Sequence, residues 1–281
     1  MFTIRSLRAF YINRFLRIAP AYYASILLCI FVFYPHVPLA PFDLFRFFTF
    51  TANMQYFSLP YQQLLVIIST QMQFYLAAPI FFLVLRAAIR KIHPVVIGIS
   101  ILVLGALVRY LFASAGLVTD LPSYMIHIYV TVWGMIDYFL FGMFISSLRP
   151  KTFRFPPVIG YFLFFIFFCA ISYTNYYGLS WNSYAVLHHY IIPPVLCVLI
   201  GWYILSARVE VPILSSIGKY SYGLYLYHFI FFDLLYRLPN HIDTSIIGFV
   251  YRFVTVLFLS GIMALASYYF IERLLRSYRS R

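Results

Sequence analysis

The sequence predicts an all-α, polytopic integral membrane protein, and three observations support this fold class. Of its 281 residues, 64% are hydrophobic and only 10% are charged, whereas a soluble domain carries about 25% charged residues. Apolar stretches close to the length of a membrane-spanning helix recur along the chain. The 27 Tyr and 32 Phe suit a protein whose surface meets lipid and the membrane–water interface.

The apolar stretches predict about eight transmembrane helices within one transmembrane domain, residues 1–281. A ninth apolar stretch, Phe42–Phe57, is short and interrupted by Asp43 and Arg46, so we expect a re-entrant or interfacial segment. Prolines such as Pro20 are expected at helix ends, whereas Pro79 falls within a span and predicts a kink. The expected spans are Ala19–Tyr34, Leu64–Leu85, Pro94–Ala115, Met125–Leu148, Pro156–Tyr173, Ala185–Ser206, Ile213–Tyr236 and Ile246–Ile271.

The distribution of the basic residues predicts the orientation. If the N-terminus is cytoplasmic, sixteen of the 20 Lys and Arg residues fall on the inner side and four on the outer side or in the outer half of a span. Such a bias predicts cytoplasmic N- and C-termini. The net charge of +13 then reflects loops at an anionic inner leaflet rather than a nucleic-acid partner. The segment Thr3–Ile18 alternates Arg with apolar residues, which predicts a basic amphipathic helix leading into the first span rather than a signal peptide.

Three short segments could carry chemistry, and each also has a purely structural interpretation. Arg14 and Arg17 share one helix face and could hold phosphate groups bidentately, or could anchor the span at lipid headgroups. The structural interpretation of the polar side chains between Ser69 and Gln73 is that they form hydrogen bonds with neighbouring helices. Ser221, Tyr225 and His228 lie on one face of a predicted span. The histidine there either has a functional role or is a neutral side chain that hydrogen-bonds to a neighbouring Tyr or Ser.

Other polar residues within spans need partners. Asp137 lies near the middle of a span, and Arg109, His127 and Arg252 are candidate partners among which the sequence does not choose. The three cysteines lie in apolar stretches without C-x-x-C spacing, so neither a disulfide framework nor a metal site is expected.

At these same segments the chain resembles the membrane acyltransferase-3 family, bacterial proteins that O-acylate surface sugars and related acceptors. Arg14 through Pro20 resembles the family's R-x-x-R-I-x-P segment, and Ser69 through Pro79 is similar to the later part of W-S-L-x-x-E-x-Q-F-Y-L-x-x-P. Ile217 through His228 resembles G-x-x-S-Y-x-x-Y-L-x-H, and Glu272-Arg273 resembles the closing E-[RK]. The four segments occur in the family's order over nearly the whole chain.

The chain departs from the family pattern at two places. Members of the family usually have ten core spans, and the first carries an Arg and then a His taken as the catalytic base. This chain begins just before their third span, so we expect a fragment, a mispredicted start or a degenerate member, and the sequence does not decide between an active and an inactive short chain. Val66 and Gln71 stand where the family has Trp and Glu.

The resemblance implies a membrane O-acyltransferase that moves an acyl group, expected to be acetyl, from acyl-coenzyme A to a hydroxyl of a carbohydrate or cell-envelope glycan. Acyl-coenzyme A would be a co-substrate and no cofactor would be bound. Arg14 and Arg17 would bind the donor, and the catalytic base is unknown, with His228 as the candidate. The expected pocket residues are Gln71, Tyr75, Asp137, Ser221, Tyr222, Tyr225 and His228.

The expected partners are the lipid bilayer, the acyl donor and a carbohydrate or glycolipid acceptor, and the expected location is the inner cell membrane. The alternative function is a transporter or flippase for a glycolipid or small anion, which kinked spans and buried ionisable residues would suit. A third possibility is a membrane partner without catalytic activity.

Overall fold

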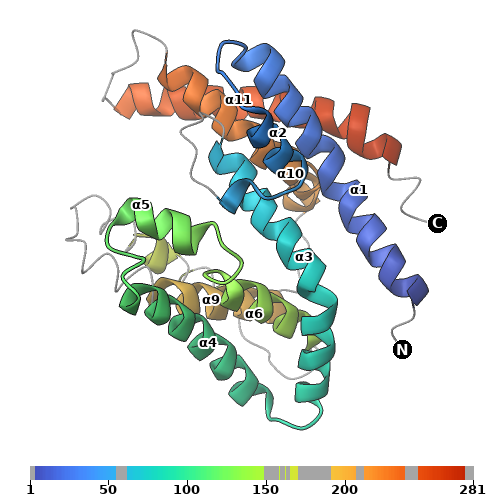
Figure 1. Ribbon diagram of the computed structural model, residues 1–281, viewed down its shortest axis with the longest axis vertical. Coiled ribbons are helices and arrows are strands. Elements are labelled where there is room, and N and C mark those ends of the chain that lie inside the picture. The colour runs from blue at the N-terminus through green and yellow to red at the C-terminus, as the bar shows by residue number, and fades with distance from the viewer. Residues whose placement is uncertain are drawn as a thin grey trace. The chain divides into compact units, whose positions relative to one another are not determined.

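The computed structural model describes residues 4–54, 62–148, 158, 162, 165–169, 191–206, 212–237 and 246–275. Across these residues the regular elements are helices and none is a strand (Figure 1), which confirms the all-α prediction. The chain divides into two compact units. We call residues 1–76 with 211–281 the terminal unit, and residues 77–210 the central unit.

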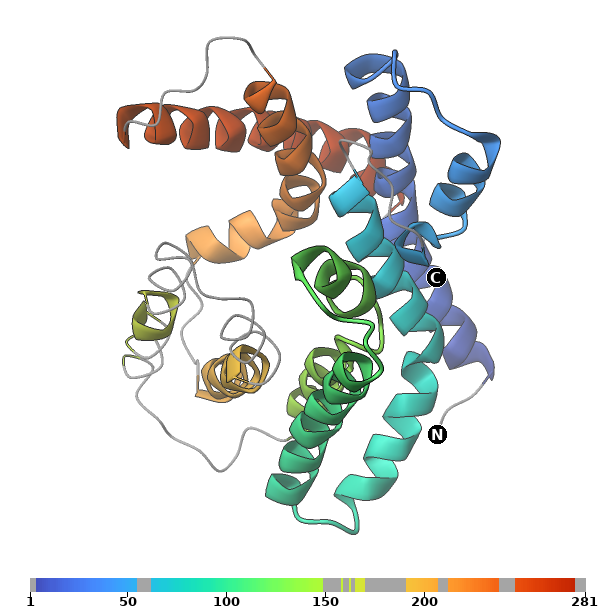
Figure 2. The same cartoon turned by 60° about the vertical axis from the view of Figure 1, so that its left-hand side comes forward.

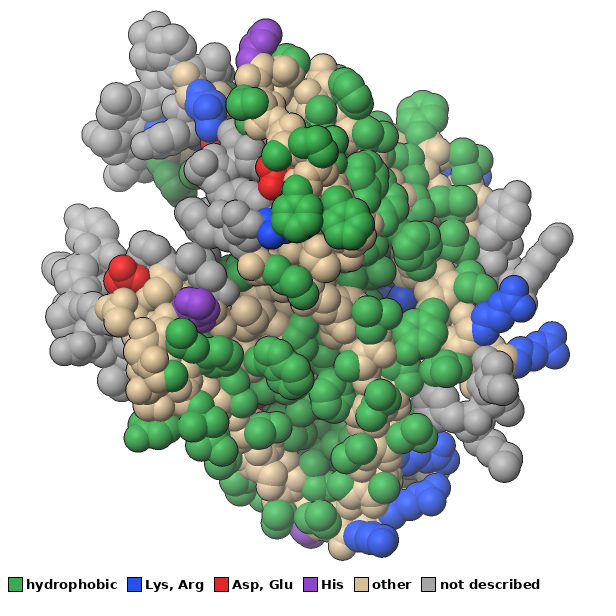
Figure 3. Space-filling model, in the orientation of Figure 1, with side chains coloured by type: hydrophobic (Ala, Val, Ile, Leu, Met, Phe, Trp, Pro, Cys, Tyr) green, Lys and Arg blue, Asp and Glu red, His purple; other side chains and the backbone are tan. Residues whose placement is uncertain are grey.

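Four helical segments in the described part of the chain are long and apolar enough to cross a bilayer: Arg5–Phe33, Leu65–Ile89, Pro94–Ser114 and Gly248–Leu275. Each has at least 21 residues, and a span needs about 20. Their hydrophobic side chains are exposed in large numbers, as the face shown in Figure 3 illustrates. The structure therefore supports a membrane protein, while the number eight stays a prediction.

In the terminal unit, helix α1 (Ile4–Leu28) continues into the π-helical turn η1 (Cys29–Phe33). The predicted helix boundary at Pro20 is wrong, because this proline lies inside α1. A single proline removes one main-chain hydrogen bond, and a helix of 25 residues retains the others on both sides of it. The basic N-terminal segment and the first apolar span are therefore one helix.

The predicted short segment after the first span contains helix α2 (Pro41–Phe48) and the 3₁₀ turn η2 (Ala52–Met54). Two adjacent tyrosines of α1 hold α2: the Tyr22 hydroxyl donates to the Phe47 carbonyl at 3.2 Å, and the Tyr23 hydroxyl donates to the Phe48 carbonyl at 2.9 Å. Helix α3 (Gln62–Ile89) follows and contains Pro79. Its first part belongs to the terminal unit.

The terminal unit is completed by α10 (Pro212–Tyr236), α11 (Ile246–Ser267) and the π-helical turn η5 (Tyr268–Glu272). Helices α10 and α11 pack against each other (Figure 2). They are in close contact where Gly223 faces Ala264, since a Cβ atom on Gly223 would lie 2.8 Å from the Ala264 Cα. A small residue at such a contact lets two backbones approach closely within a membrane.

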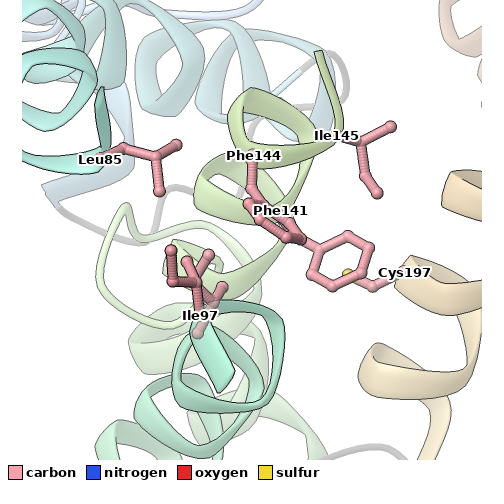
Figure 4. Packing of buried hydrophobic residues seen from close by; sticks show 7 residues of the cluster. Leu85, Ile97, Phe141, Phe144, Ile145 and Cys197 are labelled. Carbon is pink, nitrogen blue, oxygen red and sulfur yellow. The ribbon is translucent and has the colours of Figure 1, made fainter. Parts of the chain in front are cut away.

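The central unit contains α4 (Pro94–Ser114), α5 (Leu121–Tyr124), the π-helical turn η3 (Met125–Tyr129), α6 (Ile136–Ser147) and α9 (Ile192–Ser206). Helix α6 packs against α4 and against α9. The apolar core of this unit (Figure 4) comprises Leu85, Ile97, Ile101, Phe141, Phe144, Ile145 and Cys197.

The predicted continuous span Met125–Leu148 is wrong, because the chain turns between η3 and α6. Gly134 lies in this turn, and a Cβ atom there would lie 2.3 Å from the Ile128 carbonyl oxygen. The turn thus needs a residue without a side chain, and α6 retains only 12 helical residues. Of the other expected spans, Pro156–Tyr173 lies mostly, and the start of Ala185–Ser206 entirely, outside the described residues.

Candidate functional site

Arg14 and Arg17 line one small groove on α1. The groove has a volume of about 250 Å³, and its other lining residues are Phe10 and Asn13. No acidic side chain lines it, and neither arginine forms an ion pair within the part of the chain that the structure describes. The groove therefore presents two guanidinium groups to an anion.

Aromatic rings fix the guanidinium of Arg14. Its Cζ lies 5.1 Å from the ring centre of Tyr75 and 5.5 Å from that of Phe10, and both distances fit cation–π contacts. Tyr75 is held in turn, because the Gln71 side-chain amide donates to its hydroxyl at 3.0 Å. The structure thus joins Gln71 and Tyr75 to the arginine groove, while Arg17 stays exposed.

The remaining polar side chains of this part of α3 connect α3 to the segment around η2. Gln73 donates to the Phe50 carbonyl at 2.9 Å and to the Asn53 side chain at 2.6 Å, and Asn53 donates to Thr70 at 3.3 Å. Ser69 and Thr70 also donate to carbonyls one turn earlier in α3. This network matches the structural interpretation of the segment, in which polar groups join neighbouring elements.

On α10 the expected pocket residues point in different directions. Tyr225 and His228 line a cavity of about 630 Å³ between α10 and α11. The Tyr222 hydroxyl instead donates to the Ile18 carbonyl of α1 at 2.8 Å, so this side chain joins two helices. Ser221 is exposed, and its hydroxyl donates to the Gly218 carbonyl at 2.9 Å.

The hydrogen bonds of His228 determine which ring nitrogen carries the proton. Its Nδ1 lies 2.7 Å from the Tyr225 carbonyl oxygen and 3.2 Å from that of Leu224. A carbonyl only accepts, so Nδ1 is the protonated nitrogen of the neutral ring. Nε2 then keeps its lone pair and can accept a proton, which a general base requires.

Asp137 lies in the central unit and pairs with Arg109. The two Asp137 oxygens accept from Arg109 at 3.0 and 2.6 Å, and Arg109 also donates to the Gly134 carbonyl at 2.8 Å. Both side chains are buried, with exposed fractions of 1% for Arg109 and 0% for Asp137. Among the three partners that the sequence left open, the structure selects Arg109, and the pair joins α4 to the start of α6.

Comparison with known proteins adds one match. The profile of the acyltransferase-3 family, described as an acyltransferase domain, matches residues 1–271. The chain belongs to the acyltransferase-3 family. No curated protein and no solved structure is significantly similar to it.

Within this acyltransferase-3 chain, two of the family-like segments lie together in the terminal unit. The R-x-x-R-I-x-P segment forms part of α1, and the residues from Ser69 to Tyr75 supply the ring beneath Arg14. The third segment contributes Tyr222 to the contact with α1 and His228 to the cavity. The match of the family profile confirms the resemblance, whereas the roles of these residues stay predictions.

Sequence reasoning did not place two polar residues of the cavity. Ser260 and Arg252 line it together with Tyr225 and His228. Arg252 was considered only as one of three candidate partners of Asp137. Pairing the two helices as an antiparallel hairpin would have brought it near His228, because each lies within about three turns of the connected helix ends. Ser260 gave no signal, since single serines are common in spans.

Proposed function

We propose that this membrane acyltransferase moves an acyl group, acetyl in the first instance, from acyl-coenzyme A to a hydroxyl of a carbohydrate or cell-envelope glycan. Membership of the acyltransferase-3 family supports acyl transfer in general. The observation that carries the proposed donor is the groove with Arg14 and Arg17. Coenzyme A is rich in phosphate, and guanidinium groups bind phosphate oxygens bidentately.

The geometry of the groove supports distinct contributions from its two arginines. The Arg14 guanidinium is held by Tyr75 and Phe10, so little conformational freedom is lost when it binds a phosphate. Arg17 lies one turn further along the same face and is exposed. It can move onto a second phosphate, and the absence of an acidic lining residue in the described groove leaves both charges available.

In the proposed reaction, a general base removes the proton of the acceptor hydroxyl, and the hydroxyl oxygen attacks the thioester carbonyl. The new carbon–oxygen bond forms the ester, the carbon–sulfur bond breaks, and coenzyme A leaves as a thiol with the proton. His228 is the candidate base, since its Nε2 retains a lone pair. Exclusion of water by the bilayer would protect the thioester from hydrolysis.

The proposed orientation places both termini on the cytoplasmic side of the inner membrane, where acyl-coenzyme A is available. The excess of basic residues on one side supports it. Reporter fusions at Arg154 and Arg281 should give cytoplasmic signals, and a fusion at Thr119 should give an external one. An external signal at Arg281 would reverse the proposed orientation.

Titration calorimetry of the purified protein with acetyl-coenzyme A tests the donor site. Arg17→Ala should weaken binding about 10- to 100-fold, the range for loss of a hydrogen bond between charged groups. Arg17→Lys should restore only part of the affinity, because lysine lacks the planar fork. Both variants keep α1 intact, as lysine and alanine are good helix formers.

Arg8→Ala is the matched control. Arg8 is an exposed arginine of the same helix, and its nine-residue separation from Arg17 places it on the opposite face. Its loss should change affinity less than about twofold, since exposed charges act weakly at a distance in salt. If Arg17→Ala and the unaltered protein bind acetyl-coenzyme A with equal affinity, the two arginines only anchor the helix at the membrane surface.

A further inference from the structure

The groove on α1 is formed by four side chains that share one face of the helix. They are Phe10, Asn13, Arg14 and Arg17, and residues three or four positions apart are neighbours on a helix surface. The groove volume of about 250 Å³ is smaller than the about 300–1,000 Å³ of a site that encloses a whole small molecule. The groove can therefore receive one end of acyl-coenzyme A, and Asn13 is not needed for the phosphate contacts.

The side chain of Asn13 is available to a ligand. It is half-buried and forms no hydrogen bond with the residues that the structure describes. Its amide carries a donor NH₂ group and an acceptor oxygen side by side. Adenine presents the complementary pair, since its N6 amino group donates and its N7 accepts, and asparagine pairs with this edge through two hydrogen bonds in DNA recognition. The amide therefore fits an adenine base better than a phosphate group, which offers mainly acceptors.

The ring of Phe10 gives the groove a flat aromatic wall. The ring centre lies 5.4 Å from that of Tyr11 and 6.4 Å from that of Tyr75, and both contacts are T-shaped. Neighbouring rings thus fix Phe10, and the Arg14 Cζ lies 5.5 Å from its ring centre. Bases stack on aromatic rings and on guanidinium planes. A base bound at Asn13 would find both kinds of surface within the groove.

We propose that the groove recognises the adenine nucleotide end of acyl-coenzyme A, with the base at Asn13 and Phe10 and the phosphates at the two arginines. This inference rests on the proposed donor site and adds selectivity for the base to it. Asn13 and Arg17 are one helical turn apart, a spacing that suits a base and a phosphate of one nucleotide. The pantetheine chain and its thioester, which carry no charge, extend away from the groove. Asn13 is thus a specificity-determining residue for the donor.

Titration calorimetry with two nucleotides, on protein in nanodiscs of zwitterionic lipid, tests the base contact. Adenosine 3′,5′-bisphosphate contains the base and two phosphates without the pantetheine chain, and purine riboside 3′,5′-bisphosphate differs from it only in lacking the N6 amino group. The unaltered protein should bind the adenosine compound about 3- to 10-fold more tightly, the range for one hydrogen bond. Asn13→Ala should bind the two nucleotides equally, because the partner of the amino group is gone.

Three further variants separate the base contact from the phosphate contacts and from the rest of the helix surface. Arg17→Ala should weaken binding of both nucleotides by the same factor and keep the preference for adenine, since both ligands carry the same phosphates. Phe10→Leu should weaken binding of both at least about threefold through loss of stacking. Phe15→Leu is its matched control, because Phe15 is exposed on the same helix and does not line the groove; its affinities should stay unchanged. Gel filtration verifies that each variant remains folded.

The outcomes distinguish failure of this proposal from failure of the donor site on which it rests. Equal affinity for the two nucleotides, or a preference that persists in Asn13→Ala, would overturn the adenine contact and leave the arginines as phosphate ligands. Inorganic pyrophosphate bound as tightly as adenosine 3′,5′-bisphosphate would show a site for phosphate groups alone, such as those of lipid headgroups, and would overturn the adenine contact as well. Absence of binding by either nucleotide, or unchanged binding in Arg17→Ala, would contradict the donor site itself and this proposal with it.

Discussion

Replacement of Arg109 by methionine removes one half of the ion pair between α4 and α6. Methionine retains an unbranched apolar side chain, so the helix and most of the packing should persist. The Asp137 carboxylate, which is fully buried, then loses both hydrogen bonds from the guanidinium. The Gly134 carbonyl in the turn before α6 loses its bond as well.

The expected cost of Arg109→Met is about 3–5 kcal/mol, the range for breaking a buried pair by removal of one partner. Most of this cost comes from the carboxylate that stays behind. Adding Asp137→Val should therefore recover at least about 1 kcal/mol, because a buried pair replaced by apolar residues is often tolerated. The two changes together should cost less than the sum of the single changes.

Unfolding in detergent micelles by guanidinium chloride, followed by tryptophan fluorescence, measures these free energies. Trp133 lies in this turn, so it contributes to the fluorescence change when the turn unfolds. Arg90→Met provides the control, as Arg90 is exposed and its loss should change the free energy of unfolding by less than about 0.5 kcal/mol. A loss below about 1 kcal/mol for Arg109→Met, or purely additive effects in the double variant, would refute the assignment of the pair as a structural clamp.

Two further predictions concern the central unit. Gly105→Ala should destabilise the protein by about 1–3 kcal/mol, the usual cost of overpacking, because the new Cβ would lie within 2.6 Å of the Asp137 carboxyl group. Gly142→Ala, with nothing within 4 Å of the new Cβ, should be neutral or slightly stabilising in the same guanidinium chloride unfolding experiment. In the exposed loop before α5, hydrogen bonds from the side chain and backbone of Ser123 hold the pKa of Asp120 below its ordinary value. Ser123→Ala should raise that pKa, and an NMR titration with no change would contradict this cause.

The helices of this protein could be predicted from the sequence where long apolar stretches decide the structure. The structure places α4 at Pro94–Ser114 and α10 at Pro212–Tyr236, each within one residue of the expected bounds. Pro20 misled the prediction of the first span. A proline inside a helix destabilises it by about 3 kcal/mol, and the remaining hydrogen bonds and packing of a long helix can offset this loss. The turn at Gly134 was missed because its cause is a contact between two parts of the backbone.

The candidate site could be predicted in its residue types but not in its contacts. The spacing of Arg14 and Arg17 placed them on one face without any knowledge of the fold. The ring of Tyr75 beneath Arg14 depends on how α1 and α3 pack, and no local pattern encodes that contact. The same holds for Asp137, whose partner Arg109 lies 28 positions away and was one of three candidates.

Photoaffinity labelling with a coenzyme A analogue tests the central claim most directly. The analogue carries a photoreactive group on its phosphate-bearing end, and the protein is reconstituted in nanodiscs. We predict that mass spectrometry finds the label on the peptide that contains Phe10 to Arg17, that acetyl-coenzyme A competes it away, and that Arg17→Ala lowers it about tenfold while Arg8→Ala does not. Label that acetyl-coenzyme A does not displace, or that lies only in the central unit, would contradict the proposed donor site and the acyl transfer that depends on it.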